Sequence, residues 1–214
     1  MRVTEIYASV QGETGQAGRP CTLVRTTGCD LRCVWCDSAH AFYGGRELSI
    51  EEVLDAVAKL APRLVLLTGG EPLLQRELPE LAERLLARGY EVMCETSGSQ
   101  DVARLPEGVS RIVDCKPPGS GESQKMLWEN FGGGRLRRGR DAVKFVLRDR
   151  KDYDWAKEVM TRYALPKQCE VLLSPSHGEL DPKHLVAWML ADGLEARLNL
   201  QIHKYVWGAD AQGV

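Results

Sequence analysis

A repeated pattern of short apolar runs, each followed by a polar turn, most constrains the fold of this 214-residue chain. Leu64–Leu67 is a wholly apolar run that opens into Thr68–Pro72, and residues 78–86 then carry leucines at helical spacing. Similar runs recur at residues 21–25, 90–95, 111–113, 143–147, 171–173 and 197–200. Strands that alternate with helices need crossover connections, which place the strands parallel in one sheet. The sequence therefore predicts an α/β fold.

We expect about six parallel strands, fewer than the eight of a closed βα-barrel, and therefore an incomplete, laterally open barrel. Residues 1–20 are predicted to supply an N-terminal strand and a turn before the first parallel strand. Residues 117–140 are rich in Gly, Ser and Arg and are predicted to form an irregular surface loop with a short helix near Met126–Asn130. The length of the chain favours a single domain over residues 1–214.

Polar residues follow the predicted strands at their C-terminal ends, where barrel enzymes place their chemistry. These groups are Arg25 and residues 69–71, 96–98, 114–116, 174–176 and 201–204. The carboxyl ends of parallel strands share one edge of the sheet, so these groups are expected to line one site.

A loop at residues 28–38 carries three cysteines, Cys29, Cys33 and Cys36. Their spacing suits neither one face of a helix nor one face of a strand, so the loop must turn the thiols toward a common centre. A [4Fe-4S] cluster takes one thiolate per iron, and three cysteines leave one iron free to bind a small molecule. A structural zinc site with Cys21 as fourth ligand is the alternative, although zinc usually takes two well-separated ligand pairs.

Composition narrows the class of protein. Hydrophobic residues at 43% and charged residues at 27% are typical of a globular protein. The chain has no apolar run of bilayer length and no apolar core of a signal peptide at its N-terminus. Seven cysteines, an odd number, argue for a reducing compartment, and a net charge of −2 gives no attraction to nucleic acid. We therefore expect a cytoplasmic protein without membrane or nucleic-acid partners.

The cysteine spacing, with Trp35 just before Cys36, resembles the signature of the radical S-adenosylmethionine (SAM) superfamily. In that superfamily SAM binds the fourth iron. Gly69–Pro72 is by itself explained as a tight strand-to-helix turn, but beside the cysteine loop it resembles the segment that holds the SAM amino group.

Further motifs follow in order along nearly the whole chain. They are residues 9–13, Arg25, residues 36–38, 69–72, 95–98, 116–118, 143–146 and 200–204. Together they closely resemble the 7-carboxy-7-deazaguanine synthase family. The resemblance implies a radical SAM lyase that converts 6-carboxy-5,6,7,8-tetrahydropterin to 7-carboxy-7-deazaguanine with loss of ammonia, in queuosine and 7-deazapurine biosynthesis. It also implies a homodimer that is reduced by flavodoxin or ferredoxin.

The resemblance assigns site residues position by position. Cys29, Cys33 and Cys36 would bind the cluster. Matches to SAM-contacting positions are Trp35, Cys36, Asp37, Gly70, Glu71, Gly98, Asp114, Cys115 and Lys116. Matches to pterin-contacting positions are Val10, Gln11, Gly12, Glu13, Arg25, Thr96 and His203, with Arg25 on the pterin carboxylate. Ser38 stands where the family usually has the threonine that binds Mg²⁺, and its rotamer is less constrained than that of threonine.

Two other functions remain as alternatives. A glycyl-radical enzyme activase shares the cysteine loop and the chain length, but its protein substrate would have no use for Gln11–Glu13 or Arg25. A zinc-stabilised RNA-binding module would use the basic stretch Arg135–Arg140, although no aromatic residues are interleaved there to stack on bases. Tight binding of a pterin would argue against the activase. One zinc ion per chain, without iron or sulfide, would favour the RNA-binding module.

Overall fold

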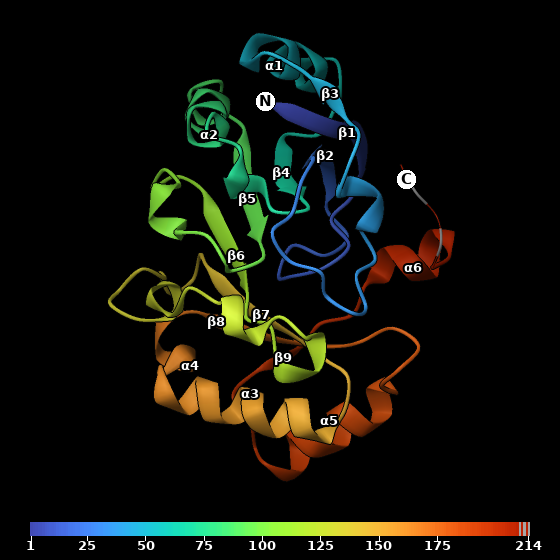
Figure 1. Cartoon of the computed structure of the whole chain (residues 1–214), viewed down its shortest axis with the longest axis vertical. Coiled ribbons are helices and arrows are strands. Elements are labelled where there is room, and N and C mark those ends of the chain that lie inside the picture. The colour runs from blue at the N-terminus through green and yellow to red at the C-terminus, as the bar shows by residue number, and fades with distance from the viewer. Residues whose placement is uncertain (210, 212, 214) are drawn as a thin grey trace.

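A computed structural model, which describes residues 1–209, 211 and 213, contains a single nine-stranded sheet with helices packed against it (Figure 1). The strand order is β3-β1-β2-β4-β5-β6-β7-β8-β9. Strand β1 pairs antiparallel with β2 and β3, and all pairs from β2 to β9 are parallel. The bounds are β1 Arg2–Val10, β2 Pro20–Thr26, β3 Arg46–Glu47, β4 Leu64–Gly69, β5 Glu91–Thr96, β6 Ser110–Asp114, β7 Ala142–Leu147, β8 Glu170–Pro175 and β9 Arg197–Leu198. Because β3 and β9 end this order, the barrel is laterally open, as predicted.

Three of the helices, α1, α3 and α5, begin at residues whose side chains accept hydrogen bonds from the first turn. Ser49 forms a capping box with Glu52 ahead of α1, and Asp149 and Asp181 cap α3 and α5. The bounds are α1 Ile50–Ala58, α2 Leu78–Ala87, α3 Arg150–Arg162, α4 Leu165–Gln168, α5 Pro182–Ala191 and α6 Ile202–Trp207. No helix within residues 1–209 is long and apolar enough to cross a membrane.

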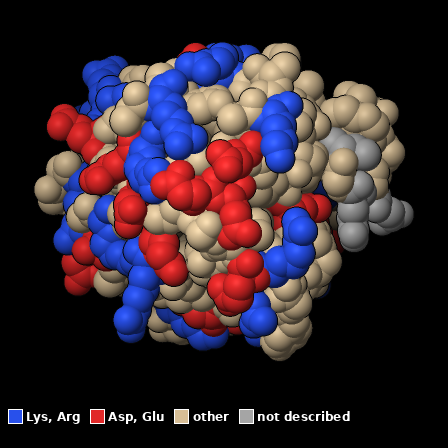
Figure 2. All heavy atoms as spheres, turned by 90° about the horizontal axis from the view of Figure 1, so that it is seen from above, with Lys and Arg blue, Asp and Glu red and all other residues tan. Residues whose placement is uncertain are grey.

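The central parallel strands are buried on both faces, which separates two apolar cores. In β4, Val65 and Leu67 belong to the larger core beneath the helices, whereas Leu64 and Leu66 belong to a smaller core inside the barrel. Figure 2 shows the face above α1 and α2, where acidic and basic side chains are interspersed. Glu51 of α1, for example, pairs with both Arg84 and Arg88. Such exposed pairs contribute little to stability, so packing in the larger core holds the helices in place.

Residues 117–140 contain no α-helix or strand, but they do not lie wholly at the surface as predicted. The segment contains three 3₁₀ helices, Pro118–Ser120, Ser123–Lys125 and Trp128–Phe131. Asn130 and Phe131 are fully buried, and Trp128 stacks on Tyr163 with 5.7 Å between the ring centroids. The segment replaces a crossover helix between β6 and β7, so its apolar side chains must cover the sheet there.

The last strand is shorter than the predicted residues 197–200. Asn199 still donates its backbone N–H to Leu173, but its side chain turns inward to accept from the Thr14 N–H at 2.7 Å. The Ile202 N–H donates to the Gly12 carbonyl at 2.9 Å, and α6 begins there. His203 consequently lies on a helix and not at the end of a strand.

Candidate active site

A cavity of about 750 Å³ lies at the C-terminal ends of the parallel strands. Successive strands β2, β4, β5, β6, β7 and β8 contribute polar lining residues, namely Arg25, Thr68, Glu95, Thr96, Asp114, Lys144 and Ser174. The cysteine loop and α6 supply much of the remaining wall. The cavity therefore lies where the sequence predicted a site.

The three loop cysteines line this cavity and are half-buried. Glu122 accepts from the Arg32 N–H at 2.6 Å and Ser120 accepts from the Val34 N–H at 3.2 Å, so the 117–140 segment holds the loop. Burial raises the pKa of Cys29 to about 11 and also raises the pKa values of Cys33 and Cys36. The free thiols are therefore protonated at neutral pH and release protons when they bind metal.

The ligand arrangement favours a cluster over a single zinc ion. Among the described residues, no three His, Cys, Asp or Glu side chains are placed to hold one metal ion. A [4Fe-4S] cluster needs only one thiolate on each of three irons and does not require the three thiols to bind one ion. Cys21, the suggested fourth zinc ligand, is fully buried in the inner core and not in the cavity wall.

Gly70 is required by the cysteine loop itself. A Cβ atom at Gly70 would lie 2.3 Å from the Gly28 carbonyl oxygen and 2.7 Å from Cys29 Cβ. The Glu71 N–H donates to that same carbonyl at 2.8 Å. The glycine therefore lets β4 and the cysteine loop approach each other, a packing reason that adds to the predicted contact with SAM.

The residues matched to SAM contacts divide into two groups. Trp35, Cys36, Asp37, Gly70, Asp114 and Lys116 line the cavity. Glu71, Gly98 and Cys115 do not, and the Cys115 side chain is fully buried in the larger core. Any contact of these three with SAM would have to be indirect or through the backbone.

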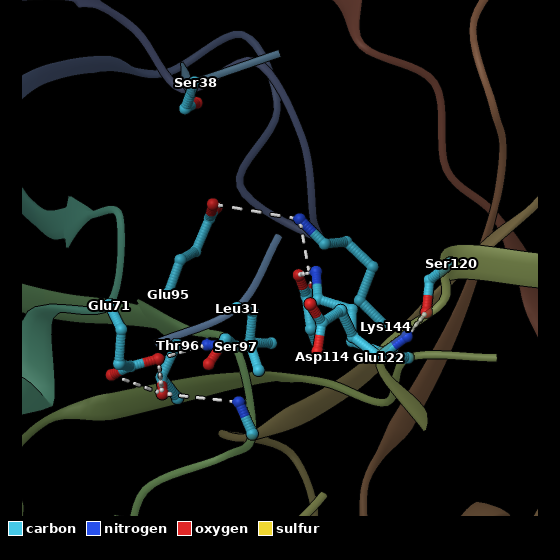
Figure 3. A network of polar contacts seen from close by, with 12 residues as sticks. Leu31, Ser38, Glu71, Glu95, Thr96, Ser97, Asp114, Ser120, Glu122 and Lys144 are labelled. Atoms are coloured by element: carbon cyan, nitrogen blue, oxygen red, sulfur yellow. Dashed lines mark hydrogen bonds and ion pairs between the residues drawn. The ribbon is translucent and has the colours of Figure 1, made fainter. Parts of the chain in front are cut away.

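The Glu71 carboxylate is fully buried and already has protein partners (Figure 3). It accepts from the Thr96 hydroxyl at 2.8 and 2.9 Å, from the Ser97 N–H at 2.6 Å and from the Leu73 N–H at 2.8 Å. Burial raises the pKa of Glu71, and these donors oppose the rise. The side chain joins the ends of β4 and β5.

The residues matched to pterin contacts all line the cavity. Gln11 and Glu13 are buried in the connection between β1 and β2, and Gln11 Nε2 donates to Glu95 at 3.2 Å. Gly12 lies against α6, because a Cβ there would come within 2.0 Å of His203 Nδ1. Burial lowers the pKa of His203, so this imidazole is neutral at pH 7.

Arg25 and Ser38 also line the cavity and lie beside each other. Arg25 Nε donates to Glu5 at 2.7 Å, and one terminal nitrogen lies 3.4 Å from Ser38 Oγ. Ser38 Oγ also donates to Asp37 Oδ1 at 3.2 Å. Asp37 in turn accepts from Gln201 at 2.9 Å and pairs with Lys204 at 3.4 Å, which joins the cysteine loop to the α6 segment.

The sequence assignment missed Lys144 and Glu95, which both line the cavity. Lys144 Nζ contacts Glu13 at 2.8 Å, Asp114 at 3.4 Å and Glu95 at 3.9 Å. The signal that could have revealed them is a charged residue inside an apolar strand, as in Val143–Phe145. Such a charge is stable only beside partners of opposite sign.

Comparisons with known proteins agree with this geometry. A model of the Radical SAM superfamily matches residues 23–117. The 7-carboxy-7-deazaguanine synthases of Koribacter versatilis and Chlorobaculum tepidum are 45% and 37% identical to the chain. Both alignments cover 100% of this chain, with 100% and 97% of the respective relatives. The chain belongs to the 7-carboxy-7-deazaguanine synthase family.

The crystal structure of QueE from Escherichia coli has the same fold, with a TM-score of 0.76 and 22% sequence identity. The match covers 94% of this chain and 93% of that chain. As a member of a radical SAM family, the chain uses a [4Fe-4S] cluster and SAM. Family membership also decides against the glycyl-radical activase and the RNA-binding module.

The basic stretch Arg135–Arg140 has a structural role. Arg135 pairs with Asp101, and Arg137 pairs with the buried Asp141 at 2.9 Å. Arg140 donates to the Gly108 carbonyl at 2.9 Å. These contacts attach the segment before β7 to the connection before β6.

Proposed function

We propose that the chain binds 6-carboxy-5,6,7,8-tetrahydropterin in this cavity and, as a lyase, forms 7-carboxy-7-deazaguanine with loss of ammonia. The product belongs to queuosine and 7-deazapurine biosynthesis. One observation carries this proposal: the cysteine loop, the Gln11–Glu13 connection and Arg25 all line one cavity in a chain similar to these synthases over its full length. We also propose that residues 1–214 act as one radical SAM domain.

On the cysteine-loop side, Cys29, Cys33 and Cys36 would hold the cluster. Trp35, Asp37, Gly70, Asp114 and Lys116 are the assigned SAM contacts that line the cavity. Glu71, Gly98 and Cys115, which do not line the cavity, would hold the SAM-contacting residues in position. The cluster and SAM together supply the hydrogen-atom abstraction that begins the reaction.

In the part of the cavity lined by the β1–β2 connection, Gln11 and Glu13 would bind the edge of the pterin ring that carries the N–H donors. Val10 and Gly12 would lie beside this edge. An ionised carboxylate and an amide suit such a ring, because both accept hydrogen bonds from its N–H groups. Arg25 would pair with the pterin carboxylate through its terminal nitrogens. Thr96 and the neutral His203 would complete the contacts, and the enclosing wall would keep water from the reacting carbon.

Ser38 would contribute a hydroxyl ligand to Mg²⁺. Asp37, whose Oδ1 lies 3.2 Å from Ser38 Oγ, and Arg25 lie beside this position. Hydroxyl and carboxylate oxygens are the hard ligands that Mg²⁺ prefers. The ion would also bind the pterin carboxylate beside Arg25.

We propose further that the protein is a cytoplasmic homodimer, reduced by flavodoxin or ferredoxin and without nucleic-acid or membrane partners. The cysteine loop exposes Val34, and Tyr43 is also exposed, which leaves apolar surface near the cluster for an electron donor. This part of the proposal rests on the family and on the reducing environment that the free cysteines imply.

The decisive assay is anaerobic. The reconstituted protein would be mixed with dithionite, SAM, Mg²⁺ and the pterin, and 7-carboxy-7-deazaguanine would be sought by mass spectrometry. We expect the product. If only 5′-deoxyadenosine forms, the radical SAM chemistry stands and the assigned substrate is wrong. If a complete cluster yields neither compound, the lyase proposal fails.

A further inference from the structure

Lys144 is a buried cation at the centre of the cavity wall. It lies on β7 between Val143 and Phe145, which are both fully buried, and its side chain is 8% exposed. Its Nζ atom contacts carboxylates from three separate elements, as Figure 3 shows for Glu95 and Asp114. Burial of an ammonium group is costly unless opposite charges surround it. The carboxylates of Glu13, Glu95 and Asp114 therefore compensate the buried charge of Lys144.

The charges in this arrangement depend on one another. Burial acts to lower the pKa of Lys144, but Asp114, Glu13 and Glu95 outweigh it and keep the pKa well above its usual range. Burial acts to raise the pKa of Glu13, but Lys144 outweighs it and lowers the pKa. Lys144 therefore stays protonated and Glu13 stays ionised at neutral pH.

The three carboxylates do not depend equally on Lys144. Asp114 also pairs with Lys116, and Glu95 also accepts from the Gln11 amide. Glu13 has two further donors, the amides of Gln201 at 2.8 Å and Asn199 at 3.3 Å. Within residues 1–209, Lys144 is the one cation that forms an ion pair with Glu13. Loss of Lys144 would therefore leave Glu13 as a buried carboxylate without a counter-charge.

We propose that Lys144 is a positioning residue that keeps Glu13 ionised and oriented for pterin binding. The inference rests on the proposed contact between Glu13 and the pterin. An ionised carboxylate accepts strong hydrogen bonds from the ring N–H groups, whereas a protonated carboxyl would compete with them as a donor. Lys144 thus acts on pterin affinity through Glu13. It also contacts Asp114, an assigned SAM contact, but Asp114 keeps a second cation in Lys116, so SAM binding should depend less on Lys144.

The test is a double-mutant cycle on the reconstituted protein with SAM bound. Pterin dissociation constants would be measured anaerobically for wild type, Glu13→Gln, Lys144→Met and the double variant. We expect each single substitution to weaken pterin binding roughly 10- to 100-fold. The double variant should bind pterin about as weakly as Glu13→Gln, because the two residues act in series. SAM affinity should change less than about threefold.

Two matched variants complete the design. Lys144→Arg keeps the positive charge and should bind pterin more tightly than Lys144→Met. Lys183→Met removes an exposed lysine at the start of α5 and should bind pterin as wild type does. Circular dichroism and iron content would verify folding. If Lys144→Met does not fold, two comparisons still test the role of Lys144. The double variant should bind pterin as weakly as Glu13→Gln, and Lys144→Arg should bind pterin more tightly than the double variant.

The outcomes separate the inference from the function on which it rests. Unchanged pterin affinity in Glu13→Gln would remove the assignment of Glu13 to the pterin. Weakened binding in Glu13→Gln, with none in Lys144→Met, would overturn the role of Lys144. Fully multiplicative losses in the double variant, or equal losses in Lys144→Arg and Lys144→Met, would also overturn it.

Discussion

Glu5 of β1 and Arg25 of β2 lie directly opposite each other in the antiparallel register, and Arg25 Nε donates to Glu5 Oε1 at 2.7 Å. This bond holds the guanidinium by its inner nitrogen. One terminal nitrogen lies near Ser38, and Arg25 lines the cavity. The pair thus presents the terminal guanidinium nitrogens to the cavity.

Arg25→Ala is expected to weaken pterin binding roughly 100-fold, because a charge-assisted bond to the substrate carboxylate is lost. SAM affinity should change less than about threefold. Glu5→Gln should weaken pterin binding to a smaller extent, since Arg25 stays in place with a weaker partner. Equilibrium binding of both ligands measures this, with the exposed Arg162→Ala as control. Comparable losses for pterin and SAM in Arg25→Ala would contradict the assigned role.

Cys33→Ala is expected to lose the cluster after anaerobic reconstitution, because two thiolates are too few to hold four irons. Cys169→Ala should retain it, since Cys169 is buried in the larger core away from the cavity. Iron and sulfide analysis, with the visible absorption of the cluster, measures both variants. Full iron content in Cys33→Ala would show that the cysteine loop is not the cluster site.

Ser38→Ala is expected to raise the Mg²⁺ concentration needed for pterin binding by roughly tenfold, because one hard oxygen ligand is lost. Ser38→Thr should need no more Mg²⁺ than wild type, since its β-methyl group restricts the hydroxyl rotamer. Titration of pterin binding with Mg²⁺ distinguishes the variants. A Mg²⁺ requirement that is the same in all three proteins would place the ion elsewhere.

Glu71→Gln is expected to lower the free energy of unfolding by about 2–4 kcal/mol, because the new amide N–H₂ would face backbone and hydroxyl donors. Glu80→Gln on the exposed face of α2 should change it by less than about 0.5 kcal/mol. Urea unfolding of the two variants without cluster provides the measurement. A small effect in Glu71→Gln would mean that its hydrogen bonds from Thr96, Ser97 and Leu73 contribute little to the fold.

His203 is expected to titrate below its usual pKa of 6.5, because burial lowers the pKa and outweighs the opposing charges of Glu13 and Asp37. Between the folded value and 6.5 the unfolded chain binds more protons than the folded chain. Stability therefore rises with pH in this interval, and the contribution is lost as pH falls from 6.5. NMR of the imidazole should show a midpoint below 6.5, absent in His203→Gln. A midpoint above 6.5 would contradict this prediction, because stability would then fall as pH rises above 6.5.

Much of the fold could be predicted from local patterns. The apolar run Leu64–Leu67 and its successors have strand length, and the Ser49–Glu52 box caps a helix, so these elements needed no tertiary information. The 117–140 segment could not be predicted in this way. Its Gly and Arg content is typical of a loop, yet a missing crossover helix leaves a gap that Asn130 and Phe131 fill.

The site residues show a similar division. The positions of the three cysteines and Arg25 in one cavity followed from the rule that parallel strands present their C-terminal ends at one edge. Gln11–Glu13 follows the antiparallel strand β1, so this rule does not place it, and only the family resemblance assigned it to the site. Glu71 could be assigned a ligand role from sequence because carboxylates often bind ammonium groups. The structure adds that its carboxylate accepts hydrogen bonds from Thr96, Ser97 and Leu73, which no local sequence pattern indicates.

The sequence by itself determined the class of fold, the edge of the sheet that carries the site and the cofactor loop, because these depend on periodicity and on short-range spacing. Only the tertiary structure decided which side chains meet there. Glu13 and Lys144 are 131 residues apart, and their 2.8 Å contact arises because the β1–β2 connection and β7 bring them to the same cavity. No local pattern encodes such a pair, because its energy depends on the burial of both charges by the rest of the fold.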